Sequence, residues 1–119
     1  PKLRRLYRAV RDAQEAALEA AREGVTAESV DRAARRVLRE AGLEKAFVHS
    51  TGHGLGLEVH EAPRVARKVK TRLRAGMAIT VEPGVYLQGL GGIRIEDTIV
   101  VTSGGCEILT PTPKELIEL

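Results

Sequence analysis

The chain has 119 residues, 43% of them hydrophobic, and its 19 Lys and Arg against 16 Asp and Glu give a net charge of +3. This length and apolar content are sufficient for one soluble domain, residues 1–119, with a single hydrophobic core. No apolar run approaches the roughly 18 residues of a membrane span, no secretory signal is visible and the lone Cys106 cannot form an internal disulfide, so we expect a cytoplasmic protein without membrane contact.

The first third of the chain predicts two amphipathic helices, at about residues 2–23 and 27–41. Apolar residues recur at three- and four-residue spacing in both segments. Thr26 is the expected N-cap of the second helix, because its side chain can accept a backbone hydrogen bond. Gly24 and Gly42 are the residues expected to end the two helices.

From about residue 46 to residue 110 the apolar period changes to two, which predicts a mainly antiparallel, curved sheet. β-branched residues mark its clearest strands, at residues 77–81, 92–101 and 106–109. Pro111 and Pro113 end the last strand, and Lys114 to Leu119 are expected to begin a short helix. The predicted fold is therefore α+β, with the two N-terminal helices packed on the sheet.

The distribution of charge disfavours nucleic acid as a partner. Most arginines lie on the predicted helices among acidic residues, as Arg35 does beside Asp31, and this mixture is typical of a solvated helix face. Residues 64–74 form the only patch of a single sign, and three scattered aromatic residues cannot form a base-stacking platform. The absence of Asn, with one Met and one Cys, is typical of a thermophile or of a GC-rich genome.

All three histidines lie in the segment HSTGHGLGLEVHE, as His49, His53 and His60. Its glycine spacing does not match a phosphate-binding loop, and a strand-like segment follows instead of a helix. The glycines instead predict a backbone that passes close to its neighbours or adopts positive φ. Three histidines in one loop and strand favour metal or proton chemistry over a single buried structural histidine.

Two carboxylates follow at predicted strand ends. In ITVEPG, Glu82 ends an apolar strand, where Pro83 forces the chain to turn. In GIRIEDT, strand alternation places Arg94 and Glu96 on one face and Asp97 on the other. An exposed Arg94–Glu96 ion pair would explain these residues as well as metal ligation does. An imidazole with two carboxylates suits Mn²⁺, Co²⁺, Fe²⁺ or Zn²⁺.

The motifs GHGLGLEVHE, ITVEPGVY and GIRIEDTIVVT, in this order after two helices, resemble the C-terminal half of the pita-bread metallopeptidases. These form the superfamily of creatinase, methionine aminopeptidase and prolidase. His49 and the HE after LEV are most similar to Xaa-Pro aminopeptidases and Xaa-Pro dipeptidases. The resemblance covers nearly the whole chain and implies half of a pita-bread fold. It also implies a parent activity, hydrolysis of the bond between an N-terminal residue and proline, with peptides carrying proline at the second position as substrates.

The resemblance implies a metal site as well. His53 and Glu82 match metal ligands, and Glu96 matches the glutamate that bridges two ions. The complete family site holds two divalent ions, for which Mn, Co and Zn are the candidates here. These ions activate a shared water as hydroxide, while Glu82 takes up the proton.

The substrate-binding residues implied by the resemblance surround this metal site. His60 matches the histidine that contacts the scissile peptide and steadies its developing oxyanion. His49 matches a second histidine beside the substrate, and Arg94 matches the arginine that accompanies the bridging glutamate.

The chain departs from the family pattern in one respect, because the family completes its site with two aspartates from the first half of the fold. Here Asp12 and Asp31 lie on predicted helices and Asp97 faces away from Glu96, so at most one ion is expected in the isolated chain. The chain is then either part of a longer enzyme with a separate N-terminal half or one subunit of a C₂ homodimer. In the dimer, the glutamates of one copy would replace the aspartates of the other.

The alternatives to an enzyme are a catalytically inactive homodimeric scaffold and a protein-binding pseudo-peptidase module. Retention of His53, His60, Glu82 and Glu96 favours the enzyme, because a binding module has little physical reason to keep metal ligands.

Overall fold

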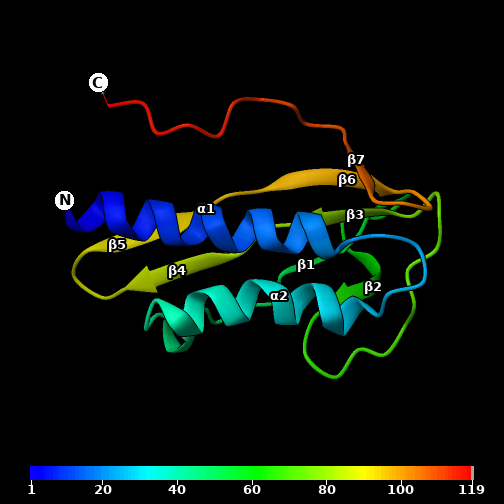
Figure 1. Ribbon diagram of the computed structural model, residues 1–119, viewed down its shortest axis with the longest axis horizontal. Coiled ribbons are helices and arrows are strands. Elements are labelled where there is room, and N and C mark those ends of the chain that lie inside the picture. The colour runs from blue at the N-terminus through cyan, green and yellow to red at the C-terminus, as the bar shows by residue number, and fades with distance from the viewer. Residues whose placement is uncertain (119) are drawn as a thin grey trace.

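The computed structural model describes residues 1–118, and Leu119 lies outside the described residues. Two helices, α1 (Lys2–Ala20) and α2 (Ala27–Glu40), are followed by a short 3₁₀ helix, η1 (Glu44–Ala46). Figure 1 shows α1 and α2 in front of the strands, with the segment after the last strand running back along α1. The strands are β1 (Gly52–Gly54), β2 (Glu61–Val65), β3 (Ala78–Val81), β4 (Gly84–Leu87), β5 (Gly91–Arg94), β6 (Asp97–Val101) and β7 (Cys106–Ile108).

The two helices form as expected, but α1 is shorter than predicted. It ends at Ala20 instead of residue 23, because Ala21 is extended and the next backbone N–H groups bond to the sheet region. Gly24 has a φ of +91° in the following turn and does not end the helix. In α2 the expected cap is confirmed, since Thr26 Oγ1 accepts from Ser29 N at 3.2 Å. Gly42, with a φ of +74°, follows the end of α2 as expected.

Within residues 1–118 the strands form an antiparallel five-stranded sheet in the order β2-β1-β3-β6-β7 and a separate β4–β5 hairpin. The strand expected over residues 92–101 is thus divided into β5 and β6, which belong to different sheets. The break lies at Ile95 and Glu96. Because Ile95 is buried and Glu96 is exposed, the alternation of faces continues through the break.

The expected C-terminal helix is absent from the described residues 114–118. Its first carbonyl group, that of Lys114, accepts a hydrogen bond from the Tyr7 hydroxyl of α1. The ammonium group of Lys114 in turn forms an ion pair with Asp97 Oδ1 at 2.8 Å. These contacts hold Lys114 against α1 and β6, and the described residues that follow it form no helix.

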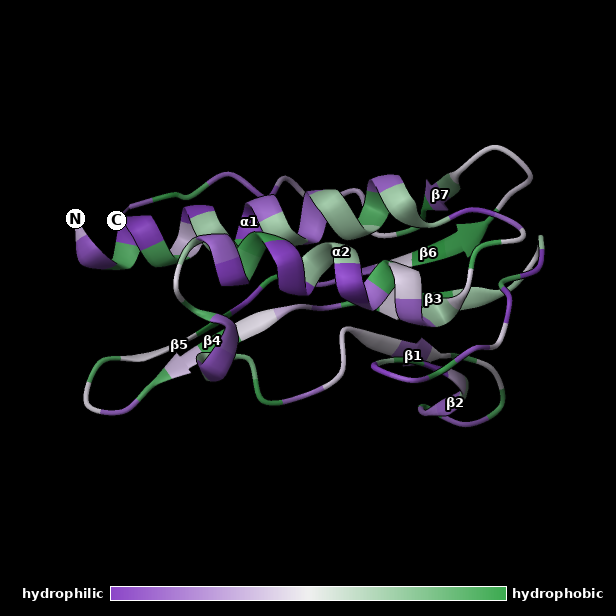
Figure 2. Cartoon of the chain, turned by 60° about the horizontal axis from the view of Figure 1, so that its bottom comes forward, coloured by the Kyte–Doolittle hydropathy of each residue, from purple (hydrophilic) through white to green (hydrophobic). Residues whose placement is uncertain are grey.

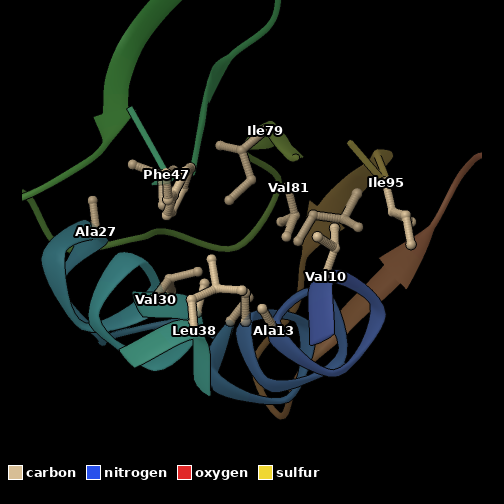
Figure 3. Close-up of a cluster of buried hydrophobic side chains, with 14 of the residues drawn as sticks. Val10, Ala13, Ala27, Val30, Leu38, Phe47, Ile79, Val81 and Ile95 are labelled. Carbon is tan, nitrogen blue, oxygen red and sulfur yellow. The ribbon is translucent and has the colours of Figure 1, made fainter. Parts of the chain in front are cut away.

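The core lies between the helices and the five-stranded sheet. Figure 3 shows Val10 and Ala13 of α1 and Leu38 of α2 directed toward Ile79 and Val81 of β3. All five side chains are fully buried. Hydrophilic residues alternate along the helices with apolar ones, so each helix presents one apolar face to the core (Figure 2). Among the described residues, no helix combines the length and the hydrophobicity that a membrane crossing requires.

Candidate metal and peptide site

Strand register brings the two glutamates of the predicted site together. Val81 of β3 pairs with Asp97 of β6, so the next residues outward, Glu82 and Glu96, face each other beyond the pair. The N–H of Ile95 donates to the carbonyl oxygen of Pro83 at 3.3 Å and keeps the two segments adjacent. Opposed residues of antiparallel strands share one face of the sheet, so their side chains can interact.

The glycines beside His53 allow β1 to lie very close to its neighbours. A Cβ atom on Gly52 would lie 1.8 Å from the carbonyl oxygen of Thr80, and one on Gly54 would lie 2.3 Å from that of Ala62. Both distances are far below van der Waals contact, which confirms the predicted close backbone approach. β1 lies between β2 and β3, and its residue His53 donates its backbone N–H to Thr80 Oγ1 of β3 at 3.1 Å.

The imidazole of His53 is oriented toward Glu82 in a way that suits metal ligation. Its Nδ1 lies 2.9 Å from the carbonyl oxygen of Gly54, and because a carbonyl only accepts, Nδ1 carries the proton. Nε2 of the neutral ring then presents its lone pair, 3.3 Å from Glu82 Oε2. Two donors each about 2.1 Å from one ion at a tetrahedral angle stand about 3.4 Å apart, so this pair fits a shared divalent cation.

Glu96 lies beside this pair without closing a full coordination set. Partial burial, and then the charge of Glu82, raise the pKa of Glu96, while Arg94 and His53 lower it. Arg94 Nε lies 3.9 Å from Glu96 Oε2, and both side chains remain about half exposed. Within residues 1–118, no group of three His, Cys, Asp or Glu side chains is close enough to hold a metal ion. The donor types therefore fit a divalent metal, but further ligands are required.

The three aspartates do not supply those ligands. Asp12 is exposed on α1, and Asp31 is buried in an ion pair with Arg35. Asp97 points away from Glu96 and bonds Gln14, Thr110 and Lys114.

A cleft of about 830 Å³ adjoins the His53–Glu82 pair. Five of the six predicted site residues line it: His49, His53, His60, Glu82 and Arg94. His60 is exposed in the loop between β1 and β2, and its ring centroid lies 4.3 Å from that of His53. His60 therefore lines the cleft directly beside the His53–Glu82 pair.

His49 lies at another wall of the cleft and is already fixed at both ring nitrogens. Its Nδ1 lies 2.8 Å from the carbonyl oxygen of Ser50, and its Nε2 lies 2.8 Å from the Tyr86 hydroxyl. With Nδ1 donating to that carbonyl, Nε2 of the neutral ring accepts from Tyr86. Tyr86 was not among the predicted site residues, and the ITVEPGVY motif was the only signal for it.

The expectation that Asp31 and Arg35 lie on a solvated helix face is wrong. Asp31 is 0% exposed and Arg35 is 8% exposed. Both belong to the buried stripe of α2 that includes Ala27, Val30, Ala34 and Leu38. Their three- and four-residue spacing from these apolar residues was the signal that could have predicted their burial. Their hydrogen bonds reach the segment that carries His49, so they support the site from behind.

The model of metallopeptidase family M24 matches residues 1–103 of this chain. The chain belongs to metallopeptidase family M24. The Xaa-Pro dipeptidase of Pyrococcus furiosus is 48% identical to the M24 chain over 116 residues, which make up 98% of this chain and 33% of that protein. The Xaa-Pro dipeptidase of Lactobacillus delbrueckii is 44% identical over 115 residues, covering 97% of this chain and 31% of the relative.

The structural comparison agrees with the family. The Xaa-Pro dipeptidase from Bacillus anthracis superimposes on the M24 chain with a TM-score of 0.97 at 49% identity, covering 99% of this chain and 33% of that structure. The expected resemblance is thus confirmed, and so is the α+β fold, which is the C-terminal half of a pita-bread catalytic domain. The M24 chain spans about a third of the length of the relatives it matches.

Proposed function

We propose that this chain provides the His–Glu part of a metal-dependent peptidase that hydrolyses the bond between an N-terminal residue and proline. The observation that carries the proposal is the His53–Glu82 pair, with Nε2 and Oε2 3.3 Å apart and the other ring nitrogen held by a backbone carbonyl. Membership of a metallopeptidase family and similarity to proteins named Xaa-Pro dipeptidase support it.

In this proposal the metal ligands are His53, Glu82 and Glu96. A bound divalent ion, for which Mn, Co and Zn are the candidates, would activate water and polarise the peptide carbonyl. Glu82 accepts the proton released by the water. The family resemblance implies two ions, and the strand register that sets Glu82 opposite Glu96 supports a shared carboxylate site.

The cleft residues bind the peptide in the proposed reaction. His60 is exposed beside His53 and donates a hydrogen bond to the carbonyl oxygen, where negative charge develops. His49 forms a second surface for the peptide at another wall of the cleft. Hydrogen bonds to Tyr86 and Ser50 hold its ring in place. Arg94 lines the same cleft near Glu96 and offers a cation to the substrate or to the bridging carboxylate.

The proposed catalytic unit is larger than this chain alone, because the metal site needs more ligands than the described residues supply. The missing carboxylates come either from a separate N-terminal half or from a second copy of this chain related by a twofold axis. Leu57 and Val59, in the loop between β1 and β2 that also carries His60, are 105% and 71% exposed, and apolar residues this exposed favour coverage by a partner.

Native mass spectrometry of the chain after Mn²⁺ loading, followed by an assay with an Xaa-Pro dipeptide, tests this function. We expect bound Mn²⁺, and hydrolysis of the dipeptide wherever a partner completes the site. The variant E82Q should lose hydrolysis while remaining folded. A dimer that carries Mn²⁺ would support completion by a second copy, and a metal-free monomer would refute it. Hydrolysis that persists unchanged in E82Q would contradict the proposed role of Glu82.

A further inference from the structure

We propose that Asp31 and Arg35 of α2 are positioning residues that hold the ligand-bearing segments of the site in place. This inference rests on the proposed metal-peptidase function. Neither side chain contacts the metal or the peptide in the proposed site. They act through the segment His49–Thr51, which precedes His53 and contacts Glu82.

Asp31 and Arg35 form a buried ion pair. Arg35 Nε donates to Asp31 Oδ2 at 2.7 Å, and the side chains are 10% and 0% exposed. A buried ion pair contributes little net stability, because the loss of hydration offsets its attraction, and apolar residues often replace such pairs without loss. Stability alone is therefore a poor reason for this pair on the apolar face of α2.

The remaining hydrogen bonds of the pair reach the segment that precedes β1. Asp31 Oδ1 accepts from Thr51 Oγ1 at 2.7 Å and from Thr51 N at 3.3 Å. Arg35 Nη2 donates to the carbonyl oxygen of His49 at 3.0 Å. The guanidinium also lies 4.3 Å from the ring centroid of Phe47, which packs edge-on against His49. The pair thus fixes this segment at both ends.

Thr51 passes this constraint to the candidate ligands. Its carbonyl oxygen accepts from Glu82 N at 2.6 Å, so the backbone position of Glu82 depends on the position of Thr51. His53 follows Thr51 by two residues and is the central residue of β1. A displacement of Thr51 would therefore change the distance between His53 Nε2 and Glu82 Oε2.

Two conservative variants test the inference. T51V removes the hydroxyl that bonds Asp31 but keeps the volume and the backbone groups. R35K keeps the positive charge, but a single ammonium group cannot reproduce the planar fork that reaches both Asp31 and His49. The matched control is R39K, because Arg39 lies one turn further along α2 in an exposed ion pair with Glu44.

The measurements are the Co²⁺ affinity, read from the visible absorption of the bound ion, and the NMR signals of the Glu82 amide and the His53 ring in the metal-free chain. We expect T51V and R35K to keep the wild-type far-UV circular dichroism while binding Co²⁺ at least about tenfold more weakly, as changes to the groups that orient metal ligands do. Both NMR signals should shift more than in R39K.

The outcomes separate this inference from the function on which it rests. Co²⁺ affinities within twofold of wild type in T51V and R35K, with unshifted signals, would overturn the positioning role. If R35K does not fold, T51V decides by the same criteria. If the wild-type chain takes up no Co²⁺, the metal function fails, and the Glu82 and His53 signals alone then support or refute positioning.

Discussion

His53 and Glu82 meet across the pairing of β1 with β3, with Nε2 of the imidazole 3.3 Å from Oε2 of the carboxylate. They are 29 positions apart in the chain, and each side chain is mostly buried. Because His53 Nδ1 donates to a carbonyl, two electron-pair donors point at the same space. This space suits a divalent cation, and the following prediction tests whether the pair binds one.

Replacing His53 with alanine should weaken Co²⁺ or Mn²⁺ binding at least about 100-fold, because changes outside the ligand set already cost ten- to hundredfold. The fold should persist, since the side chain is not part of the core. Isothermal titration calorimetry measures the affinity, with H49A as the control, because Tyr86 already occupies His49 Nε2. Equal metal affinity in H53A and wild type would sink the metal assignment.

Glu96 gives a pH-dependent prediction for the metal-free chain. Partial burial and the charge of Glu82 raise its pKa, so the folded chain binds the proton more tightly than the unfolded chain does. Ionised Glu96 therefore opposes folding at neutral pH, and this cost disappears as the pH falls through the raised pKa. Without metal, E96Q should be more stable than wild type at pH 7, and the difference should shrink toward pH 4.

Urea denaturation across this pH range measures that difference. The exposed Glu107 on β7 offers a matched control, E107Q, whose free energy of unfolding should stay within about 0.5 kcal/mol of wild type. A stability difference for E96Q that does not vary with pH would contradict the prediction. In the presence of metal the order should reverse, because the proposed ligand Glu96 binds a divalent ion more tightly as a carboxylate than the neutral amide of E96Q does.

Lys114 should stabilise the fold through Asp97. Burial alone would raise the pKa of Asp97, but hydrogen bonds from Lys114, Gln14 and Thr110 outweigh burial and lower it. Replacing Lys114 with methionine leaves a buried carboxylate without its cation, which should cost about 2 kcal/mol of unfolding free energy at pH 7.

The sign of the pH dependence follows from the lowered pKa. Native Asp97 contributes stability above the unfolded carboxyl pKa of about 3.9, and this contribution is lost as the pH falls through the lower folded value. The cost of K114M in urea denaturation should therefore diminish in acid. R4M serves as the control, because Arg4 pairs with Glu118 on the surface of the same region and should matter much less. An equal cost in both variants would argue against the buried pair.

Gly52 should tolerate no side chain. A Cβ atom there would lie 1.8 Å from the backbone oxygen of Thr80, which cannot move without breaking the β1–β3 pairing. We expect G52A to lose about 3 kcal/mol or more of stability. G104A is the matched control, since a Cβ atom on Gly104 would meet nothing within 4 Å and its change should stay within about 0.5 kcal/mol. Thermal unfolding of both variants measures this, and similar melting temperatures would refute the close approach.

The sequence by itself determined the features that depend on neighbours in the chain. Helix periodicity placed α1 and α2, the Thr26 cap acts within one turn, and the glycines around His53 marked a close backbone approach. The motifs identified the family because their residues occur in a fixed order. Each of these signals is read from consecutive residues or from the order of short motifs, so the linear sequence is sufficient to reveal it.

Only the tertiary structure decided which distant residues meet. Pairing of Val81 with Asp97 sets Glu82 opposite Glu96, and register between strands is a non-local property that a one-residue slip would reverse. Burial of Asp31 and Arg35 depended on the hydroxyl of Thr51 and the carbonyl of His49, 20 and 14 residues away. Charged residues remain solvated unless such partners exist, because burial without them costs several kcal/mol, and no local pattern shows where the partners lie.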